Sequence, residues 1–421
     1  MFKSVWKSLG RFLLGLSVLS FSADALTIQK RNNPVFDYTT EIIRGVNIGG
    51  WLVLEPWITP SLFQQFEGQA NVAVDEWTFC EFLGAEEAQK QLNEHWSTFY
   101  TYDDFARIAG WGVNVVRIPI GYWAFSVADY EPFVQGQEYW LDQAISWARS
   151  VGLKVWIDLH GAPGSQNGFD NSGKRGGIGW QKGDTVARTY RVISTIIQKY
   201  TQSAYADVVI GIETLNEPLA ANLDLAWLKQ YDRDAYNQIS SLSSTVATVF
   251  HDGYISLSDW NEGLLDPSSY DLILDTHHYE VFSSGQCAMS FTDHLNSICN
   301  FGNSIASSPF LVVTGEWSAA LDDCAKWLNG MDTGARYDGT FTNSYYVGTC
   351  NTDINNWTAD FRSQVRQYIE TQLDQYERGR GWFFWTAKTE KTAPGWDMGE
   401  LVDNGIFPQP LTDRSFAAYC S

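Results

Sequence analysis

The sequence predicts a single (β/α)₈ barrel, an α/β fold, and three observations support this prediction. Short apolar runs alternate with longer amphipathic stretches along the chain, which is the pattern of repeated strand–helix units. Eight such runs occur, and most of them end in polar or charged residues. The chain has 421 residues, enough for one large barrel with long loops.

Each strand is predicted where a short apolar run is bounded by turn-forming residues, because such a run indicates a buried strand. The predicted strands cover residues 43–48, 113–120, 154–159, 208–215, 254–257, 272–275, 310–314 and 382–385. Helices are predicted between them at 86–99, 102–108, 139–149, 186–200, 226–248 and 360–376. The longest predicted loops are 47–74, 161–184, 281–309 and 318–356, and long loops in compact domains are usually functional.

The N-terminus has the features of a secretory signal. Lys3, Lys7 and Arg11 precede an apolar stretch, and Ala23-Asp24-Ala25 fits a signal cleavage site. Lys30-Arg31 resembles a dibasic processing site. We therefore expect a signal peptide at 1–25, a short propeptide at 26–31 and the barrel at 32–421. With no later stretch apolar enough to span a bilayer, we expect a secreted protein without a membrane anchor.

The formal net charge of −21 argues against nucleic acids and anionic membrane surfaces as partners, and suits a neutral substrate. Six cysteines in a secreted chain permit disulfides, but their spacing does not fix the pairing. There is no Cys-x-x-Cys and no metal-ligand spacing, which favours a structural role for the cysteines. Asn356-Trp357-Thr358 is the one N-glycosylation sequon.

Two glutamates terminate buried strands. Glu217 closes the stretch Glu213-Thr214-Leu215-Asn216-Glu217-Pro218, and Glu316 follows the run at 310–314. In a barrel the carboxyl ends of the strands converge, so these side chains can meet. Glycoside hydrolysis needs two such carboxylates, one to protonate the leaving oxygen and one to attack or to activate water. The alternative is that each glutamate only pairs with an arginine at a strand end.

Leu215-Asn216-Glu217-Pro218 and Gly315-Glu316-Trp317-Ser318 resemble the acid/base and nucleophile motifs of glycoside hydrolase family 5. The stretch 44–57, RGVNIGGWLVLEPW, is similar to the secreted fungal exo-1,3-β-glucanases (glucan 1,3-β-glucosidases). The similarity runs from about Val35 to Cys420. It implies a retaining enzyme that releases glucose from the non-reducing ends of β-1,3-glucan in cell-wall metabolism, with transglucosylation as a side reaction.

The resemblance makes Glu217 the acid/base and Glu316 the nucleophile. Glu217 must hold a proton, so we expect a raised pKa, caused by the negative charge of Glu316. Glu316 must be ionised, and Arg117 and Tyr279 are the candidate donors to it. Asn216 could hydrogen-bond the sugar 2-hydroxyl, as the matching residue does in the family.

Further strand ends supply candidate substrate-binding residues. We expect His160 and His277 to donate to sugar hydroxyls or to orient the carboxylates, and Trp385 to form the floor of a sugar subsite. The resemblance adds Glu55 as a binder of the terminal glucose, with Phe169 and Phe282 as an entrance clamp. The pair His277-His278 does not suggest a metal site, since adjacent strand residues point to opposite faces.

The mechanism requires no cofactor and no metal, which leaves room only for accessory stimulation by a divalent ion such as manganese. The resemblance also implies disulfides Cys299–Cys420 and Cys324–Cys350 and a buried free thiol at Cys80, whereas the state of Cys287 stays open. We expect a monomer. The alternatives are an endo-β-1,4-glucanase or mannanase on the same barrel, and a non-catalytic glucan-binding wall protein; the presence of both glutamates argues against the latter.

Overall fold

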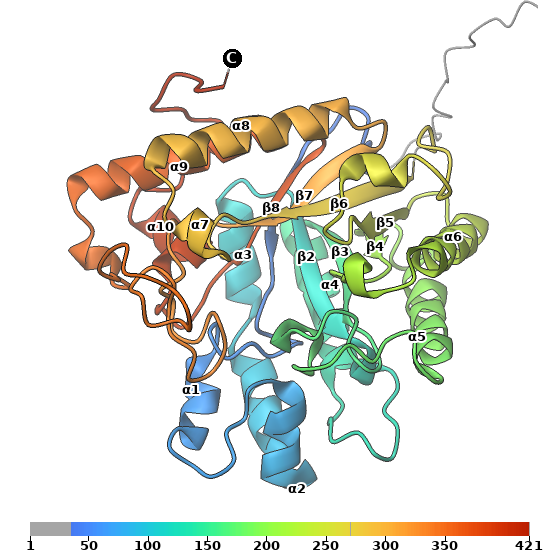
Figure 1. The fold of residues 1–421 in the computed structure, drawn as a ribbon. Coiled ribbons are helices and arrows are strands. Elements are labelled where there is room, and N and C mark those ends of the chain that lie inside the picture. The colour runs from blue at the N-terminus through green and yellow to red at the C-terminus, as the bar shows by residue number, and fades with distance from the viewer. Residues whose placement is uncertain (1–34, 270, 421) are drawn as a thin grey trace, which may run out of the picture.

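The computed structural model describes residues 35–269 and 271–420, and these form a closed barrel of parallel strands surrounded by helices (Figure 1). The strands follow one another around the barrel in chain order, and β8 pairs with β1. They are β1 (Ile43–Asn47), β2 (Val115–Gly121), β3 (Lys154–Gly161), β4 (Val209–Glu213), β5 (Ala247–His251), β6 (Leu272–His278), β7 (Leu311–Trp317) and β8 (Gly381–Phe384). The predicted (β/α)₈ barrel is confirmed.

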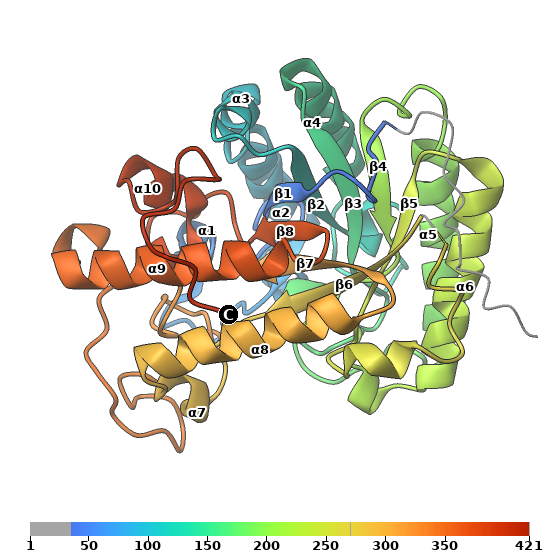
Figure 2. The same ribbon diagram turned by 90° about the horizontal axis from the view of Figure 1, so that it is seen from above.

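The longer helices pack around the outside of the barrel, as the view from above shows (Figure 2). The helices are α1 (Pro60–Phe63), α2 (Glu76–Thr98), α3 (Tyr102–Gly110), α4 (Gln137–Val151), α5 (Thr185–Tyr200), α6 (Leu225–Leu242), α7 (Ser284–Cys287), α8 (Phe291–Ser307), α9 (Ala359–Tyr376) and α10 (Met398–Asp403). The predicted signal peptide and propeptide lie outside the described residues. No described helix combines the length and the apolar character needed to cross a membrane.

The barrel interior is layered, as side chains from the strands fill such barrels. The N-terminal end is filled by an apolar cluster that includes Trp156, Ile210 and Phe383. Tyr38 closes this end, and its hydroxyl donates to the carbonyl of Ile210 at 2.9 Å. Polar and charged side chains occupy the levels nearer the carboxyl ends, where the candidate site lies.

The prediction for the fifth strand was wrong. Residues 254–257 do not form a strand; β5 is Ala247–His251, and its first two residues overlap the end of the helix predicted at 226–248. The helix α6 ends at Leu242, and Ser243 takes the C-cap position in an extended conformation. The β-branched and aromatic run that follows is fully buried as a strand. The error matters because the side chains at the carboxyl end of β5 were not recognised as candidate site residues.

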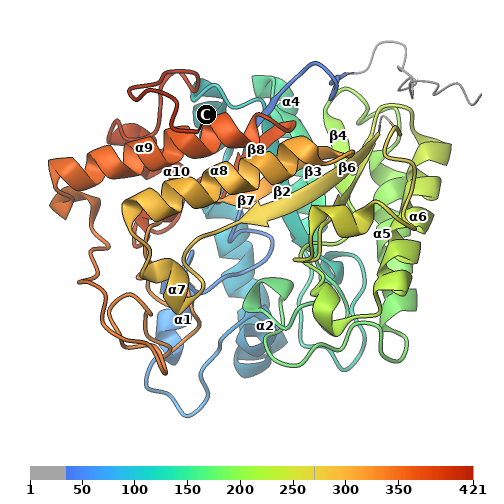
Figure 3. The same cartoon turned by 45° about the horizontal axis from the view of Figure 1, so that its top comes forward.

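A second error concerns residues 281–309, predicted as a loop. They contain α8, which begins with a capping box formed by Ser290 and Asp293. The buried residues Leu295, Ile298 and Ile305 follow at helical spacing. The helix lies beside α9 (Figure 3). A capping signal before an apolar periodic stretch would have revealed it.

The predicted disulfides are both present. Cys299–Cys420 ties the C-terminal segment to α8, and Cys324–Cys350 closes the long loop after β7. Cys80 is a buried free thiol, as expected, and Cys287, which the sequence left open, is also free and buried.

Candidate active site

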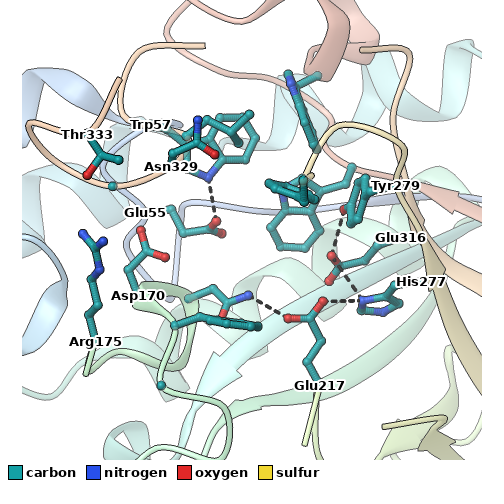
Figure 4. Close-up of a pocket in the computed structure, with 18 of the residues that line it drawn as sticks. Glu55, Trp57, Asp170, Arg175, Glu217, His277, Tyr279, Glu316, Asn329 and Thr333 are labelled. Atoms are coloured by element: carbon teal, nitrogen blue, oxygen red, sulfur yellow. Dashed lines mark hydrogen bonds and ion pairs between the residues drawn. The ribbon is translucent and has the colours of Figure 1, made fainter. Parts of the chain in front are cut away.

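A cavity of about 650 Å³ opens at the carboxyl ends of the strands (Figure 4). Its wall includes both glutamates, Glu217 and Glu316. Six other residues predicted from the sequence also line it: Glu55, Phe169, His277, Tyr279, Phe282 and Trp385. The expected convergence of strand ends therefore brings together residues from the whole length of the chain.

Glu217 lies just beyond the end of β4 in an unusual backbone conformation, with φ of +46°. Non-glycine residues rarely adopt this left-handed region, and such residues cluster at functional sites. The turn directs the carboxylate into the cavity, where it accepts a hydrogen bond from Nδ2 of Asn171 at 3.0 Å. His277 lies on its other side, with Nδ1 2.8 Å from Oε1.

Glu316 lies within β7, which runs past the predicted end of this strand. Its two oxygens each accept one hydrogen bond from a predicted donor. Arg117 donates from Nη1 to Oε1 at 3.1 Å, and the Tyr279 hydroxyl donates to Oε2 at 2.9 Å. Both donors stabilise the ionised form of the carboxyl group, which is the form a nucleophile needs.

His277 contacts both carboxylates through one ring atom (Figure 4). Its Nδ1 is 2.8 Å from Oε1 of Glu217 and 3.4 Å from Oε2 of Glu316. These two oxygens can therefore be no farther apart than the sum of the two distances. This limit applies to one oxygen of each carboxyl group, and it favours the approximately 5–5.5 Å carboxyl separation of retaining glycosidases over the roughly 6.5–9.5 Å of inverting ones.

The expected pKa order is reversed in this structure. Burial opposes ionisation of Glu217, but the hydrogen bond and charge of His277 outweigh burial and hold the pKa of Glu217 below its usual range. Burial raises the pKa of Glu316, against the lowering effect of His277 and Arg117. The prediction that Glu316 raises the pKa of Glu217 was wrong, because it did not anticipate a charged ring between the two groups.

A polar layer lies directly beneath the two glutamates, with Arg117 at its centre. Nε of Arg117 donates to Glu213 at 2.7 Å, and Nη2 donates to Asn216 at 2.8 Å and lies 3.2 Å from Asp158. The guanidinium is fully buried and does not line the cavity. Arg117 therefore acts through the residues that it holds, and it forms ion pairs inside the barrel as well as the predicted bond to Glu316.

His160 and Asn216 are also buried behind the cavity wall. Nδ1 of His160 is 2.6 Å from Asp158, and its ring stacks on Trp385 at a centroid distance of 5.5 Å. Nε2 of His160 and Nδ2 of Asn216 are buried without a hydrogen-bond partner. Because buried polar atoms are nearly always paired, these atoms are suited to bonds with a ligand.

Glu55 and the two phenylalanines lie where the predictions require. Glu55 is buried and accepts a hydrogen bond from Nε1 of Trp57 at 2.9 Å. Burial, followed by the charge of Asp170, raises its pKa well above the ordinary value and so favours its protonated form. Phe169 and Phe282 line the cavity and remain 41% and 43% exposed, as a surface-facing clamp would be.

Several residues of the site were missed. Asn171 belongs to the long loop after β3, whose amide-rich composition was the available signal. His251 is the last residue of the true β5 and Tyr254 follows it; both were missed because the strand was predicted at 254–257. The His251 ring contacts His277 at a centroid distance of 4.3 Å, and Tyr254 lines the cavity and lowers the pKa of Glu217.

Among the described residues, two groups could offer three ligand atoms to a metal: Glu217, His251 and His277, or Glu213, Asp275 and His277. Both groups depend on His277, whose two ring nitrogens already face carboxylates. The predicted separation of the neighbouring histidines is confirmed. His278 turns outward, where its ring stacks on Phe301 and Nδ1 lies 2.7 Å from the Tyr376 hydroxyl.

Comparison with known proteins gives a family and near full-length relatives. The model of the family "Cellulase (glycosyl hydrolase family 5)" matches residues 80–387. "Glucan 1,3-beta-glucosidase 1" of Schizosaccharomyces pombe is 58% identical, covering 96% of this chain and 98% of that protein. "Glucan 1,3-beta-glucosidase" of Lachancea kluyveri is 48% identical, covering 93% and 92%.

Among solved structures, a rutinosidase from Aspergillus niger superposes with a TM-score of 0.70 at 21% sequence identity. The match covers 89% of this chain and 99% of that one. At this identity the likeness concerns the fold, and it agrees with the closed barrel described above.

Proposed function

The chain belongs to glycosyl hydrolase family 5, and from that premise we propose that it is a retaining exo-β-1,3-glucanase. It would release glucose from the non-reducing ends of β-1,3-glucan. The observation that carries the proposal is the pair Glu217 and Glu316, which face one cavity and share contact with Nδ1 of His277. The names and near full-length similarity of the fungal relatives support the substrate class.

In the first chemical step Glu316 attacks the anomeric carbon while a proton passes through Glu217 to the leaving oxygen. Arg117 and Tyr279 hold the attacking carboxylate by its two oxygens. In the second step Glu217 takes a proton from water, which attacks the glycosyl ester and frees Glu316. A sugar hydroxyl can replace that water, and the result is transglucosylation. These steps need no cofactor.

The binding residues have separate roles in this proposal. The unpaired Nε2 of His160 and Nδ2 of Asn216 would donate to hydroxyls of the terminal glucose. Trp385 would pack against a face of the sugar ring, and Glu55 would hydrogen-bond a hydroxyl farther from the scissile bond. Phe169 and Phe282 would hold the next glucose residues at the entrance.

An exo mode of action is favoured by a contact between two of the loops that line the cavity. Arg175, in the loop after β3, packs on Gly330, in the loop after β7. A Cβ atom at Gly330 would lie 2.1 Å from Nη1 of Arg175, so the guanidinium rests directly on the backbone. Two loops from different sides of the barrel thus meet at the cavity. Such a contact suits a pocket for a chain end better than the open cleft of an endoglucanase.

We also propose secretion and action on extracellular or cell-wall glucan as a monomer. Two disulfides fit an oxidising compartment. Asn356 is exposed just before α9, where the glycosylation machinery could reach it.

The test is product analysis on laminarin over time, with Glu316→Gln as the inactive control. An exo enzyme yields glucose from the first time point. A mixture of oligosaccharides at early times would instead indicate an endo enzyme. Binding of laminarin by the wild-type protein without any product would favour the non-catalytic wall protein.

A further inference from the structure

Asp275 is a buried carboxylate that the mechanism above does not use. It lies on β6, inside the barrel and behind the ring of His277. Its Oδ1 accepts a hydrogen bond from the backbone N–H of Gly315 at 2.7 Å. Its Oδ2 lies 3.4 Å from Nε2 of His277 and 3.9 Å from Nε of Arg117. Asp275 thus connects the strand that carries Glu316 with the ring that contacts both glutamates.

The residue next to Glu316 makes room for this carboxylate. A Cβ atom at Gly315 would lie 2.1 Å from Oδ2 and 2.2 Å from Oδ1 of Asp275, far inside van der Waals contact. A side chain at position 315 would therefore displace Asp275. The close approach of the carboxylate to the backbone of β7 depends on glycine, and it fixes where Oδ2 can lie relative to His277.

The ring of His277 has a carboxylate oxygen opposite each nitrogen. Nδ1 faces Glu217 and Glu316, and Nε2 faces Asp275. A neutral imidazole has one N–H and one lone pair, so one nitrogen would direct its lone pair at an anionic oxygen. The doubly protonated ring avoids this repulsion and presents an N–H on each side. Nε2 makes no hydrogen bond in this structure, so its contact with Oδ2 of Asp275 at 3.4 Å is an ion pair.

We propose that Asp275 is a positioning residue that keeps His277 doubly protonated, so that the free enzyme stores its catalytic proton on Nδ1 of His277. The inference rests on the proposed function, since it concerns the proton that the glycosidase reaction consumes. It deepens that function by separating two tasks. Glu217 delivers the proton, whereas His277 and Asp275 hold it until the substrate is in place.

The proton balance is complete without a further reactant. As the first step begins, the Nδ1–H bond of His277 breaks and an O–H bond forms at Oε1 of Glu217. That proton then passes to the glycosidic oxygen as its bond to the anomeric carbon breaks and the ester with Glu316 forms. In the second step Glu217 removes a proton from water and returns it to Nδ1. The ring of His277 is then doubly protonated again, and one water molecule has been consumed.

The other titratable groups around the ring do not supply this function. His251 contacts the ring edge-on, and burial followed by the charge of His277 lowers its pKa, so it stays neutral. Burial raises the pKa of Asp252, on the same side, to about 7. Arg117 bears a fixed positive charge that opposes protonation of the ring. Burial also opposes it, yet Glu316, Asp275 and Glu217 together raise the pKa of His277 well above its ordinary value.

The charge of the ring can be measured without substrate. We would record the side-chain nitrogen resonances of the six histidines in ¹⁵N-labelled wild-type protein, and assign His277 with a His277→Gln variant. We expect both ring nitrogens of His277 to carry protons at about pH 7, half a unit above the reference pKa of histidine. A neutral His277 ring in the wild-type protein overturns the proposal, whether or not any variant folds.

The variant Asp275→Asn tests the role of the carboxylate. Its amide can still accept from Gly315, but its NH₂ group would donate to Nε2 and hold the ring neutral. We expect the His277 resonances to show the neutral form, and the alkaline limb of kcat/KM to move to lower pH. Each unit of that movement slows the reaction about tenfold on the alkaline side. Unchanged resonances and an unchanged alkaline limb would refute the role of Asp275.

Asp232→Asn is the matched control. Asp232 is another buried aspartate that bonds a barrel residue, Thr214, but it does not contact His277. The variant Asp232→Asn should leave the His277 resonances unchanged. Failure of the proposed function is a separate outcome, because it would appear as wild-type protein that is inactive on laminarin, whatever the state of the ring.

Discussion

Tyr279 donates its hydroxyl proton to Oε2 of Glu316 across 2.9 Å. The two residues come from neighbouring strands, since Tyr279 directly follows β6 and Glu316 lies in β7. Together with Arg117 on Oε1, this bond holds the carboxylate by both oxygens. The orientation and the ionisation of Glu316 therefore depend on Tyr279, a residue distant in sequence that the folding of the barrel brings next to it.

Replacing Tyr279 by phenylalanine should reduce activity and change its pH dependence. A hydrogen bond to a charged group contributes about 1.5–3 kcal/mol, so kcat/KM should fall by about one to two orders of magnitude. Loss of a donor to the charged form raises the pKa of Glu316. Because Glu316 must be ionised, the acid limb of the profile should move to higher pH. Tyr200→Phe, which removes a hydroxyl bonded to Asp142 on α4 instead, is the control.

The first anomer released should be β-glucose. One oxygen of Glu217 and one of Glu316 both contact Nδ1 of His277, which favours the short carboxyl separation of a retaining enzyme over the wider one that leaves space for a water molecule. A proton NMR time course on a laminari-oligosaccharide distinguishes the two outcomes before mutarotation. Early appearance of α-glucose would contradict the assignment of Glu316 as nucleophile.

The variants Glu316→Gln and Glu217→Gln should fail in different ways. Glu316→Gln removes the nucleophile, so hydrolysis of every substrate should nearly stop. Glu217→Gln should slow hydrolysis of laminarin about 10²–10⁴-fold, the usual contribution of general acid–base catalysis. A dinitrophenyl glucoside needs little protonation, so its first step should survive in Glu217→Gln and produce a burst as the glycosyl-enzyme accumulates.

Azide provides the control for these roles, because it attacks the glycosyl-enzyme without a general base. It should restore turnover of Glu217→Gln and yield β-glucosyl azide, and it should not rescue Glu316→Gln in this way. Equal behaviour of the two variants on the activated substrate, or formation of the α-azide from Glu217→Gln, would mean that the roles are exchanged.

Removing the disulfide Cys299–Cys420 should destabilise the protein. Its sequence separation is 121 residues, against 26 for Cys324–Cys350. In the chain-entropy model the loss is about 5 kcal/mol for the longer loop and about 3.5 kcal/mol for the shorter one, a difference of roughly 1.4 kcal/mol. Urea unfolding of the two double-serine variants measures both values. Equal stability of wild type and Cys299→Ser/Cys420→Ser would contradict the expectation.

Ionisation of Asp232 should lower the free energy of unfolding as pH rises. Burial raises its pKa from 3.8 to about 7 in the folded protein. The folded state thus binds the proton more tightly than the unfolded state, so the stabilisation is complete below about pH 4 and is lost as pH rises towards 7. Asp232→Asn keeps an acceptor for Thr214 but cannot ionise. Relative to wild type, it should gain on the order of 3–4 kcal/mol between pH 4 and 8, measured by urea unfolding.

Local sequence patterns were sufficient to predict the barrel, the two glutamates and most of the strands. Buried parallel strands are continuous apolar runs, so seven strands were visible locally, and Glu217 and Glu316 follow from their places at strand ends. Local patterns gave a wrong prediction where the end of a helix and the start of a strand lie close together in the sequence. The helix prediction extended into the first residues of the run that forms β5, and the strand itself was placed too late, so His251 at its carboxyl end was missed.

Only the tertiary structure decided which groups share protons. The pKa of Glu217 depends on the ring of His277, and that ring depends on Asp275, which fits only because position 315 is glycine. Each of these contacts joins residues from different strands, and its energy depends on distances of a few tenths of an ångström in a buried site. Residue order along the chain carries no such distances, whereas the closure of eight strands into one barrel sets them.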